Sequence, residues 1–462
     1  MAALTSSAGR LEVEEGTSFV LSGSRRSRGC TLTHDLSFPL NIHEPVQDVK
    51  DDARVGVFGA TLNLVNVIIG SGIVGLSFVG KAAGVVPFTV FICLSAFLAY
   101  VTLTMLVEAA EYTQHKSYEA IGAKALGNYG AVLTPVVIIL QNLGGMTSRL
   151  MLMNESAPPV LKLIGFSHVS VQTVQFLLTG FIIFPLCLLR DLSMLSYTSF
   201  FALCTFILIA LTSVWILVAG DTWYELKAAP NTEEGVNWSS FNFSAFQELP
   251  TVVFAFVCHT ACLPIYSQLS APSKERMAKV AGNSIGTASI LYSVTGLAGY
   301  ITYKAYTMGV LFNNWRHCSS DNMVCEDDSV YIGVLNGLFL IGVVLGYPSV
   351  HFPTRRAVIA LTVGVDAKFS MVLHCVVATG LVGTTLVIAT ALPDVSTAFS
   401  WTGVIASPLL VFVLPAFYHQ EILRQEEGLA ARHPRRLKGI FIAVFGLLFM
   451  AIGIYVKIAS LF

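Results

Sequence analysis

Long apolar runs separated by short polar segments fill the chain from residue 56 onward. A helix rises about 1.5 Å per residue, so about 20 apolar residues are needed to cross the hydrocarbon layer of a bilayer. Eleven runs are long enough to do so. Their limits are 56–80, 86–110, 130–153, 171–189, 195–218, 249–266, 282–304, 331–351, 370–391, 398–418 and 439–460. The pattern therefore predicts an all-α polytopic membrane protein with eleven transmembrane helices.

The composition agrees with a membrane protein. Hydrophobic residues make up 54% of the 462 residues and charged residues only 12%, whereas a soluble globular chain carries roughly 25% charge. So few charges cannot cover the surface of a soluble enzyme, a nucleic-acid binder or a disordered scaffold. The sequence contains no Walker A motif, no Gly-x-Ser-x-Gly elbow and no cluster of metal ligands. We therefore expect neither an ATP-driven pump nor an enzyme, and no cofactor beyond a sodium ion.

The N-terminal segment differs from the rest of the chain. Residues 1–55 contain 14 of the 55 charged residues (27 basic and 28 acidic) and no long apolar run. This composition predicts a disordered cytoplasmic tail over residues 1–54, ahead of a transmembrane domain over residues 55–462, and no cleavable signal peptide. The tail is expected to be a trafficking or phosphorylation segment; the alternative is that it docks an unknown cytoplasmic partner.

The basic residues set the orientation in the membrane. With the N-terminus in the cytoplasm, 20 of the 27 lysines and arginines lie in cytoplasmic segments, as the positive-inside rule requires. An odd number of spans then puts the C-terminus on the opposite side.

Two features of the expected outer loops agree with this orientation. Asn237 and Asn242 each begin a glycosylation sequon in the longest outer loop. Cys318 and Cys325 lie in another outer loop, where oxidising conditions permit a disulfide. Chance sequons and free thiols are the alternatives.

Two of the spans contain residues that disfavour a continuous helix. Gly70, Ser71 and Gly72 lie near the middle of the first span, and His259 and Pro264 lie near the middle of the sixth. Proline removes a backbone hydrogen bond, and histidine is costly in lipid.

Interruptions at corresponding positions of two halves are typical of transporters built from inverted repeats, with the binding site between the repeats. We therefore expect one repeat over about 56–218, a second over about 249–418, and an extra helix at about 439–460.

The interruption of the first span has a predictable chemistry. Backbone N–H groups freed around Gly70, Ser71 and Gly72 attract a carboxylate at the start of the following half-helix. The alternative is close helix packing through small residues. Asn66 lies one turn earlier and offers an amide oxygen that suits a cation; its alternative is an interhelical hydrogen bond.

Other charged or titratable residues are ambiguous. Arg149 lies about one turn from the outer end of the third span. Snorkelling to the interface is its usual explanation, and a cation facing an acidic substrate is the alternative. His259 and His351 are candidate proton relays, or else hydrogen-bonded structural residues. Glu108 and Glu111 end the second span and are expected to be solvated.

The sequence resembles the sodium-coupled neutral amino acid transporters (solute carrier family 38) of the amino acid/auxin permease superfamily. The residues that carry the resemblance are 63–76 in the first span, 141–144 in the third, 254–277 around the sixth and 351–355 in the eighth. It covers roughly residues 55–460 and is nearest to the member-6 branch of the family.

The resemblance implies a five-plus-five inverted repeat of the leucine-transporter type and secondary active transport of amino acids. By position, Asn66 matches the family's sodium-site asparagine. Residues 70–73 match the cradle for the substrate carboxylate, with Ile73 as its last member. His259, Thr260 and Ala261 match the unwound part of the sixth span, which faces the substrate ammonium.

The sequence departs from the family at the ion site. Val344 and Gly346 stand where the family has a threonine in the eighth span, and Ser349 is the nearest hydroxyl. Sodium and proton coupling both stay open. The substrate is expected to be a neutral amino acid such as glutamine, or an acidic one. The plasma membrane is the expected location and a lysosomal or endosomal membrane the alternative. A receptor that senses amino acids and signals through its tail is the second candidate function.

Overall fold

The structure of the protein is a computed structural model. It describes residues 55–189, 195–219, 235–239, 243–315, 317–318, 325–326, 330–364, 370–392 and 394–460. Chain contacts divide the protein into the units Met1–Asn41 and Ile42–Phe462. The expected tail lies outside the described residues, and everything below concerns the second unit.

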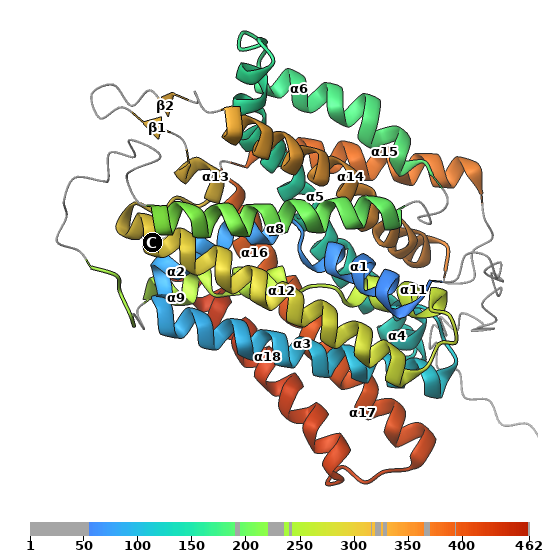
Figure 1. Ribbon diagram of the computed structural model, residues 1–462. Helices are drawn as coiled ribbons and strands as arrows, with labels where there is room; N and C mark the ends of the chain where they lie inside the picture. Colours follow the sequence, from blue (N-terminus) through green and yellow to red (C-terminus); the bar gives the residue numbers. More distant parts are fainter. Residues whose placement is uncertain are drawn as a thin grey trace, which may run out of the picture. The chain divides into compact units, whose positions relative to one another are not determined.

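The second unit is built almost entirely of helices (Figure 1). In chain order they are α1 (Val57–Ile68), η2 (Ser71–Gly75), α2 (Leu76–Ala83), α3 (Val85–Thr113), α4 (Tyr118–Leu126), α5 (Asn128–Leu163), α6 (Val171–Leu178), η3 (Thr179–Ile183), α7 (Phe184–Cys187), α8 (Leu195–Ala219), α9 (Phe243–Glu248), α10 (Pro250–Ala255), α11 (His259–Gln268), α12 (Lys274–Tyr303), η5 (Lys304–Tyr306), α13 (Leu311–Asn314), α14 (Val330–Thr362), α15 (Met371–Ala391), α16 (Val395–Pro408), η6 (Leu409–Val413), α17 (Leu414–Glu427) and α18 (Pro434–Ala459).

Each of the eleven expected spans is helical in the structure. Among the described residues, eight helices are long and apolar enough to cross a membrane, and a bent pair formed by Val57–Ile68 and Ser71–Ala83 makes nine. The helix over Val171–Cys187 is shorter, and α12 is rich in glycine, serine and threonine. The membrane-spanning, all-α fold is confirmed, whereas the count of eleven stays a prediction.

Several helices begin at residues whose side chains cap the first turn. The hydroxyl oxygens of Ser117, Ser170, Ser273 and Ser370 accept hydrogen bonds from backbone N–H groups three residues ahead, and Asp394 does the same with a carboxylate oxygen. These side chains satisfy N–H groups that have no partner within the helix. The polar segments between the apolar runs thus fix where the helices start.

Two helices are longer than the apolar runs that predicted them. α5 continues ten residues past the expected end of the third span and contains Pro158 and Pro159. α14 continues beyond the eighth span and contains Pro353. Because α5 extends to Leu163, Arg149 lies well inside the helix and not near its end.

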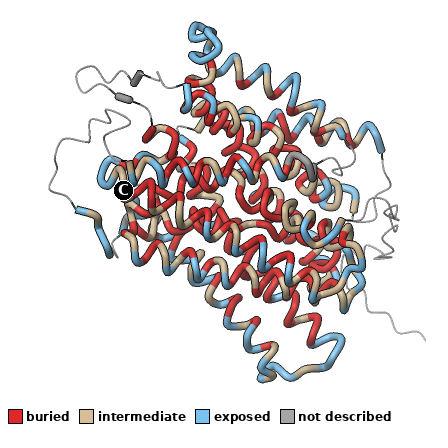
Figure 2. The backbone as a smooth tube through the Cα atoms, viewed as in Figure 1, coloured by how far each residue is buried: buried red, intermediate tan, exposed pale blue. Residues whose placement is uncertain are grey.

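Burial separates inner from outer helices (Figure 2). In the apolar windows of Ala245–Gln268 and Thr397–Glu427, 72% of the residues are buried inside the protein, against 28% for Met371–Ala391 and 33% for Pro434–Ala459. The outer helices expose apolar side chains such as Val372 and Phe441, as expected of surfaces that face lipid. The interrupted sixth span therefore lies in the protein core.

A short hairpin follows α13. Strand β1 (His317–Cys318) pairs antiparallel with β2 (Cys325–Glu326), and Cys318 is directly opposite Cys325. Directly opposed residues of antiparallel strands have Cα atoms about 4.5–5.5 Å apart, within the range that a disulfide needs. The backbone register thus permits the expected bridge, which stays a prediction.

The sequon at Asn237 is described, and its partner Asn242 lies outside the described residues. The Asn237 side chain is exposed, and its Oδ1 accepts a hydrogen bond of 3.1 Å from the backbone N–H of Ser239. Its exposure is what glycosylation requires, and the modification of both asparagines stays a prediction.

Candidate functional site

The first span is interrupted at its centre, as the Gly-Ser-Gly sequence predicts. α1 ends at Ile68, a 3₁₀ segment begins at Ser71, and the two halves of the span meet at an angle of 45°. Glycines lower the cost of such a break because they adopt backbone conformations that other residues avoid. Gly70 joins the halves with φ −96° and ψ −134°.

The sixth span is also interrupted, but not where the sequence analysis expected. α10 ends at Ala255 and α11 begins at His259, so the non-helical residues are 256–258. His259, Thr260 and Ala261 form the first turn of α11, and the expectation that they are unwound is wrong. The proline that marked the break, Pro264, lies inside α11, where it removes only the bond from its own nitrogen to the Thr260 carbonyl.

One hydroxyl group joins the two interruptions. Tyr292 of α12 places its hydroxyl oxygen 2.7 Å from the carbonyl oxygen of Ile68 and 2.9 Å from that of Ala255. These carbonyls belong to the last residues of α1 and α10, where the helical bonds stop, and the Ile68 carbonyl also accepts a 2.8 Å hydrogen bond from the Gly70 N–H. The tyrosine is fully buried, and it holds the broken ends of both spans at a fixed distance.

Close packing holds the same region together. A Cβ atom added at Gly72 would lie 2.9 Å from the Ala255 Cβ and 3.0 Å from its Cα. Real Cβ atoms rarely approach so closely, so only glycine lets η2 and α10 touch. Ser71 and Ser148 share a buried hydrogen bond of 2.9 Å, which ties η2 to α5.

An inner cavity lies between the two interruptions. Five of the seven residues predicted to bind substrate line it: Gly70, Ser71, Gly72, Thr260 and Ala261. An outer cavity, open to solvent, shares Val67, Thr260, Ala261 and Ser349 with the inner one. The two cavities are thus neighbours along one path.

Ile73 and His259 line neither cavity. Ile73 is fully buried in the hydrophobic core. The His259 ring points toward α3, where its Nε2 lies 3.0 Å from the hydroxyl oxygen of Thr102. The roles predicted for them in contacting substrate are not supported by their positions, because neighbouring side chains of a helix point in different directions.

Arg149 lines the inner cavity and is only 6% exposed. Its Nη1 donates a 3.0 Å hydrogen bond to the carbonyl of Gly145, one turn earlier in α5. A Cβ atom at Gly70 would lie 2.6 Å from its Nη2, so the guanidinium reaches the first interruption. The preferred expectation that Arg149 snorkels to the interface is wrong, because α5 continues well past it.

Asn142 is a cavity residue whose amide the sequence suggests for a cation or an interhelical hydrogen bond, and for which no contact with substrate is predicted. It is 4% exposed, it lines the inner cavity, and its Nδ2 has no hydrogen-bond partner among the described residues. Asn142, Gly145 and Arg149 are spaced i, i+3 and i+7, which puts them on one face of α5. That spacing is visible in the sequence and was the available signal.

The residues proposed for an ion site are close to the cavities but engaged elsewhere. Asn66 lines the outer cavity and donates a 3.2 Å hydrogen bond from Nδ2 to the Ser199 hydroxyl of α8. Ser349 lines both cavities and donates a 2.6 Å hydrogen bond to the Gly346 carbonyl. Asn66 thus makes the interhelical bond that was its alternative role, with its amide oxygen not used in that bond.

His351 lies away from both cavities. Its ring stacks against Tyr347 with centroids 6.3 Å apart, and it is 1% exposed. Tyr347 in turn bonds Thr385 of α15 at 2.7 Å. His351 therefore belongs to the interface between α14 and α15, which does not support contact with a substrate in either cavity.

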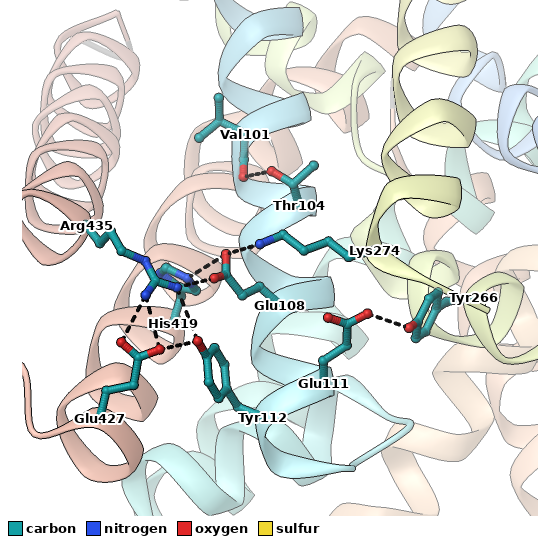
Figure 3. Close-up of polar contacts among 10 residues, drawn as sticks. All are labelled: Val101, Thr104, Glu108, Glu111, Tyr112, Tyr266, Lys274, His419, Glu427 and Arg435. Atoms are coloured by element: carbon teal, nitrogen blue, oxygen red, sulfur yellow. Dashed lines mark hydrogen bonds and ion pairs between the residues drawn. The ribbon is translucent and has the colours of Figure 1, made fainter.

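A second polar cluster joins α3, α12, α17 and α18 (Figure 3). Glu108 lies 2.9 Å from Lys274 Nζ and 3.3 Å from His419 Nε2, and it also pairs with Arg435. It is 16% exposed. The expectation that Glu108 is solvated is therefore wrong, since the cluster covers most of its surface.

The same cluster extends to two further carboxylates. Arg435 lies 2.9 Å from a carboxylate oxygen of Glu427. Glu111, on the next turn of α3, accepts a 2.9 Å hydrogen bond from the Tyr266 hydroxyl of α11. The second half of the interrupted sixth span is thus tied to the same end of α3 (Figure 3).

Residues 53–459 match the family described as transmembrane amino acid transporter protein. The chain belongs to the transmembrane amino acid transporter family. This match covers all the helices described above, and it confirms the broad family indicated by the sequence resemblance. Membership of the member-6 branch stays a prediction.

Solved structures share the arrangement of helices. A mutant of the manganese transporter of Eremococcus coleocola superimposes with a TM-score of 0.54 at 13% identity, over 92% of this chain and 90% of that one. The inward-facing conformation of Mhp1 gives 0.51 at 12% identity, over 86% and 91%. At these identities the likeness establishes the fold alone, which is that of the leucine-transporter type.

Proposed function

We propose that this transporter moves amino acids across a membrane by secondary active transport, with the inner cavity as the substrate site. The observation that carries the proposal is the meeting of the two interrupted spans around one cavity, fixed by the Tyr292 hydroxyl. Non-helical backbone at membrane depth is tolerated where it lines a cavity, and interrupted helices of this kind form substrate sites in transporters.

Each end of an amino acid has groups to meet at this site. Ser71 and Gly72, at the start of the half-helix that follows the first break, offer backbone N–H groups for the carboxylate that every amino acid carries. The Arg149 guanidinium and the Asn142 amide are left as donors for the side chain of the substrate. The breaks supply acceptors, since no hydrogen bond among the described residues reaches the carbonyl of Val257, a lining residue. An ammonium group donates three hydrogen bonds and accepts none, so it fits the carbonyl end.

The outer cavity lies on the side of the protein assigned to the cytoplasm, and it therefore supports an inward-facing conformation. Ser117, Glu119, Gln268 and Arg356 line it, and all four lie at helix ends that the positive-inside rule assigns to the cytoplasm. A substrate leaving the inner cavity would pass Thr260 and Ser349, which line both. On this assignment the N-terminus is cytoplasmic and the plasma membrane is the proposed location.

Two kinds of coupling ion are compatible with the family. Asn66 and Ser349 are the candidate sodium ligands; no carboxylate lines the inner cavity. A site with so few oxygens binds sodium weakly, because a hard cation gives up hydration only for oxygens that replace it. We therefore favour weak sodium dependence. A signalling receptor is the less favoured function, because the features described here form a transport path.

Uptake into proteoliposomes tests the proposal. Purified transporter is reconstituted and offered a panel of labelled amino acids, with sodium and proton gradients imposed in separate experiments. Saturable uptake that a gradient accelerates is expected, and Tyr292→Phe should reduce it because both broken ends lose their common partner. Absence of uptake for every amino acid, with the protein folded and correctly inserted, would refute the function.

A further inference from the structure

We infer that the substrate is an acidic amino acid, and that Arg149 selects it by pairing with the carboxylate of its side chain. The inference rests on the proposed function and names the substrate class of the same cavity. The positive charge of Arg149 at the cavity has no negatively charged partner among the described residues.

Arg149 brings a full positive charge into the centre of the protein. A guanidinium has five N–H donors and stays protonated under all physiological conditions. One donor is used by the Gly145 carbonyl, and among the described residues no carboxylate lies within 4 Å of the group. A charge at membrane depth is costly unless it is paired, and such residues mark substrate pathways. Because Arg149 lines a cavity, a ligand bound there can supply the anion that the described residues do not.

The described residues that line the inner cavity do not supply a negative charge to balance Arg149. Among the described residues that line it, there is no aspartate or glutamate. A neutral amino acid carries one carboxylate and one ammonium, so its binding leaves the net charge of the cavity at +1. An amino acid with a second carboxylate carries −1 and brings the sum to zero. Electrostatic complementarity around a guanidinium that is largely buried therefore favours the acidic substrate.

Two further observations indicate that the guanidinium faces the ligand. Asn142 is 4% exposed, and its Nδ2 has no partner although it lines the same cavity. A buried donor left without a partner costs about 1–3 kcal/mol. Gly70 leaves the space that the guanidinium occupies, because a Cβ there would meet Nη2 at 2.6 Å. Both features are accounted for if a carboxylate binds between Asn142 and Arg149.

The test compares glutamate with glutamine, which are nearly equal in size and differ in charge. In proteoliposomes the wild-type transporter should take up labelled L-glutamate with a half-saturating concentration at least about tenfold below that of L-glutamine. Arg149→Gln should remove this preference, because it raises the value for glutamate and lowers or maintains that for glutamine. Arg149→Lys should keep part of it, since the charge remains and the bidentate geometry is lost.

Arg355→Gln is the matched control. Arg355 is also a buried arginine, 4% exposed, and its guanidinium donates to the Cys187 and Leu189 carbonyls, outside both cavities. Its replacement should leave the ratio of glutamate to glutamine uptake unchanged, whatever it does to stability. Binding of each amino acid, measured by the shift in unfolding temperature of the purified variants, gives a readout that does not need transport.

Three results would overturn the inference. A wild-type preference for glutamine is one. Equal loss of glutamate and glutamine in Arg149→Gln is the second, because it would assign the arginine to the carboxylate that both share. Glutamine uptake that requires chloride is the third, since chloride would then neutralise the guanidinium. In each case amino acid uptake persists, so the proposed function survives; its own failure is the absence of all amino acid uptake.

Discussion

Glu108 and Arg149 are both largely buried charges within helices of the same protein, yet their surroundings are opposite. Glu108 has Lys274, His419 and Arg435 around it, within one cluster that joins four helices. Arg149 has one carbonyl of its own helix and an open cavity. The first charge is compensated by the chain, and the second is left for a ligand.

The comparison separates two uses of electrostatics in one membrane protein. A compensated charge contributes to stability, because its removal takes away the anion that several neighbouring side chains share. An uncompensated charge lowers the free energy of unfolding when no ligand is bound, and binding of an anionic ligand restores that stability. Replacing the two residues should therefore change different properties of the transporter.

The largest effect on stability is expected at Glu108. Glu108→Gln should lower the free energy of unfolding by about 2–4 kcal/mol, since Lys274, Arg435 and His419 lose the carboxylate that they share. Unfolding of the purified protein in detergent measures this. Glu426→Gln is the control, because its pair with Lys124 at 3.3 Å is exposed and worth at most about 1 kcal/mol. Equal effects of the two replacements would show that the Glu108 cluster contributes no more to stability than an exposed ion pair.

Steric replacements at the first interruption come next. Gly72→Ala should cost about 1–3 kcal/mol, because the new methyl group meets the Ala255 backbone and the two half-helices must separate. Gly70→Ala should cost less, since it meets only the end of the Arg149 side chain, while weakening glutamate binding. If both alanines have the same effect on unfolding and on glutamate binding, Gly70 does not serve the guanidinium.

Tyr292→Phe should have a moderate effect on both properties. The Ile68 and Ala255 carbonyls lose their shared donor, which costs about 1–2 kcal/mol, and uptake should fall several-fold. Tyr300→Phe, on the same helix and outside the cavities, is the comparison, because its hydroxyl contacts only the Asn237 backbone. Similar uptake by the two phenylalanine variants would show that transport does not depend on the Tyr292 hydroxyl.

Arg149→Gln should change stability least among the charged replacements. Without ligand, its free energy of unfolding should stay within about 1 kcal/mol of wild type or rise above it, because an unpaired buried charge is removed. Added glutamate should stabilise the wild type and leave the variant unaffected. A loss of stability as large as that of Glu108→Gln, measured in the same detergent, would show that the chain itself compensates the arginine.

Sodium dependence is expected to be the smallest effect. Replacing sodium by an inert cation should change the initial rate of uptake by about twofold or less, equivalent to about 0.4 kcal/mol. Asn66→Ala should abolish this dependence and Ser349→Ala should reduce it. Steep sodium dependence that Ser349→Ala leaves intact would refute the ion site. Proton-driven uptake that survives Asn66→Ala would move coupling to another residue.

The sequence predicted well those features that depend on local chemistry. The apolar runs coincide with helices of the structure, and the Gly-Ser-Gly sequence located the first interruption within about a residue, because glycine weakens a helix. The pairing of that interruption with one in the sixth span followed from the cost of histidine and proline in a membrane helix.

What depends on contacts between distant segments was not predictable. The second interruption ends α10 at Ala255, whose carbonyl bonds Tyr292, 37 residues later, and nothing in residues 256–258 announces it. Arg149 was assigned to the interface because the apolar run stops before the helix does. Glu108 was expected in solvent because its partners lie as far away as Arg435.

The Tyr292 hydroxyl carries a single proton, and two carbonyl oxygens lie within reach of it. Ile68 and Ala255 therefore compete for one donor, and at any instant one of them holds it more strongly. If the half-helices move apart, the hydroxyl can follow either of them and keep a full hydrogen bond. Separating the half-helices then breaks only the weaker of the two hydrogen bonds of the Tyr292 hydroxyl. A shared hydrogen bond of this kind positions both helix ends and still lets them separate at a small cost in free energy.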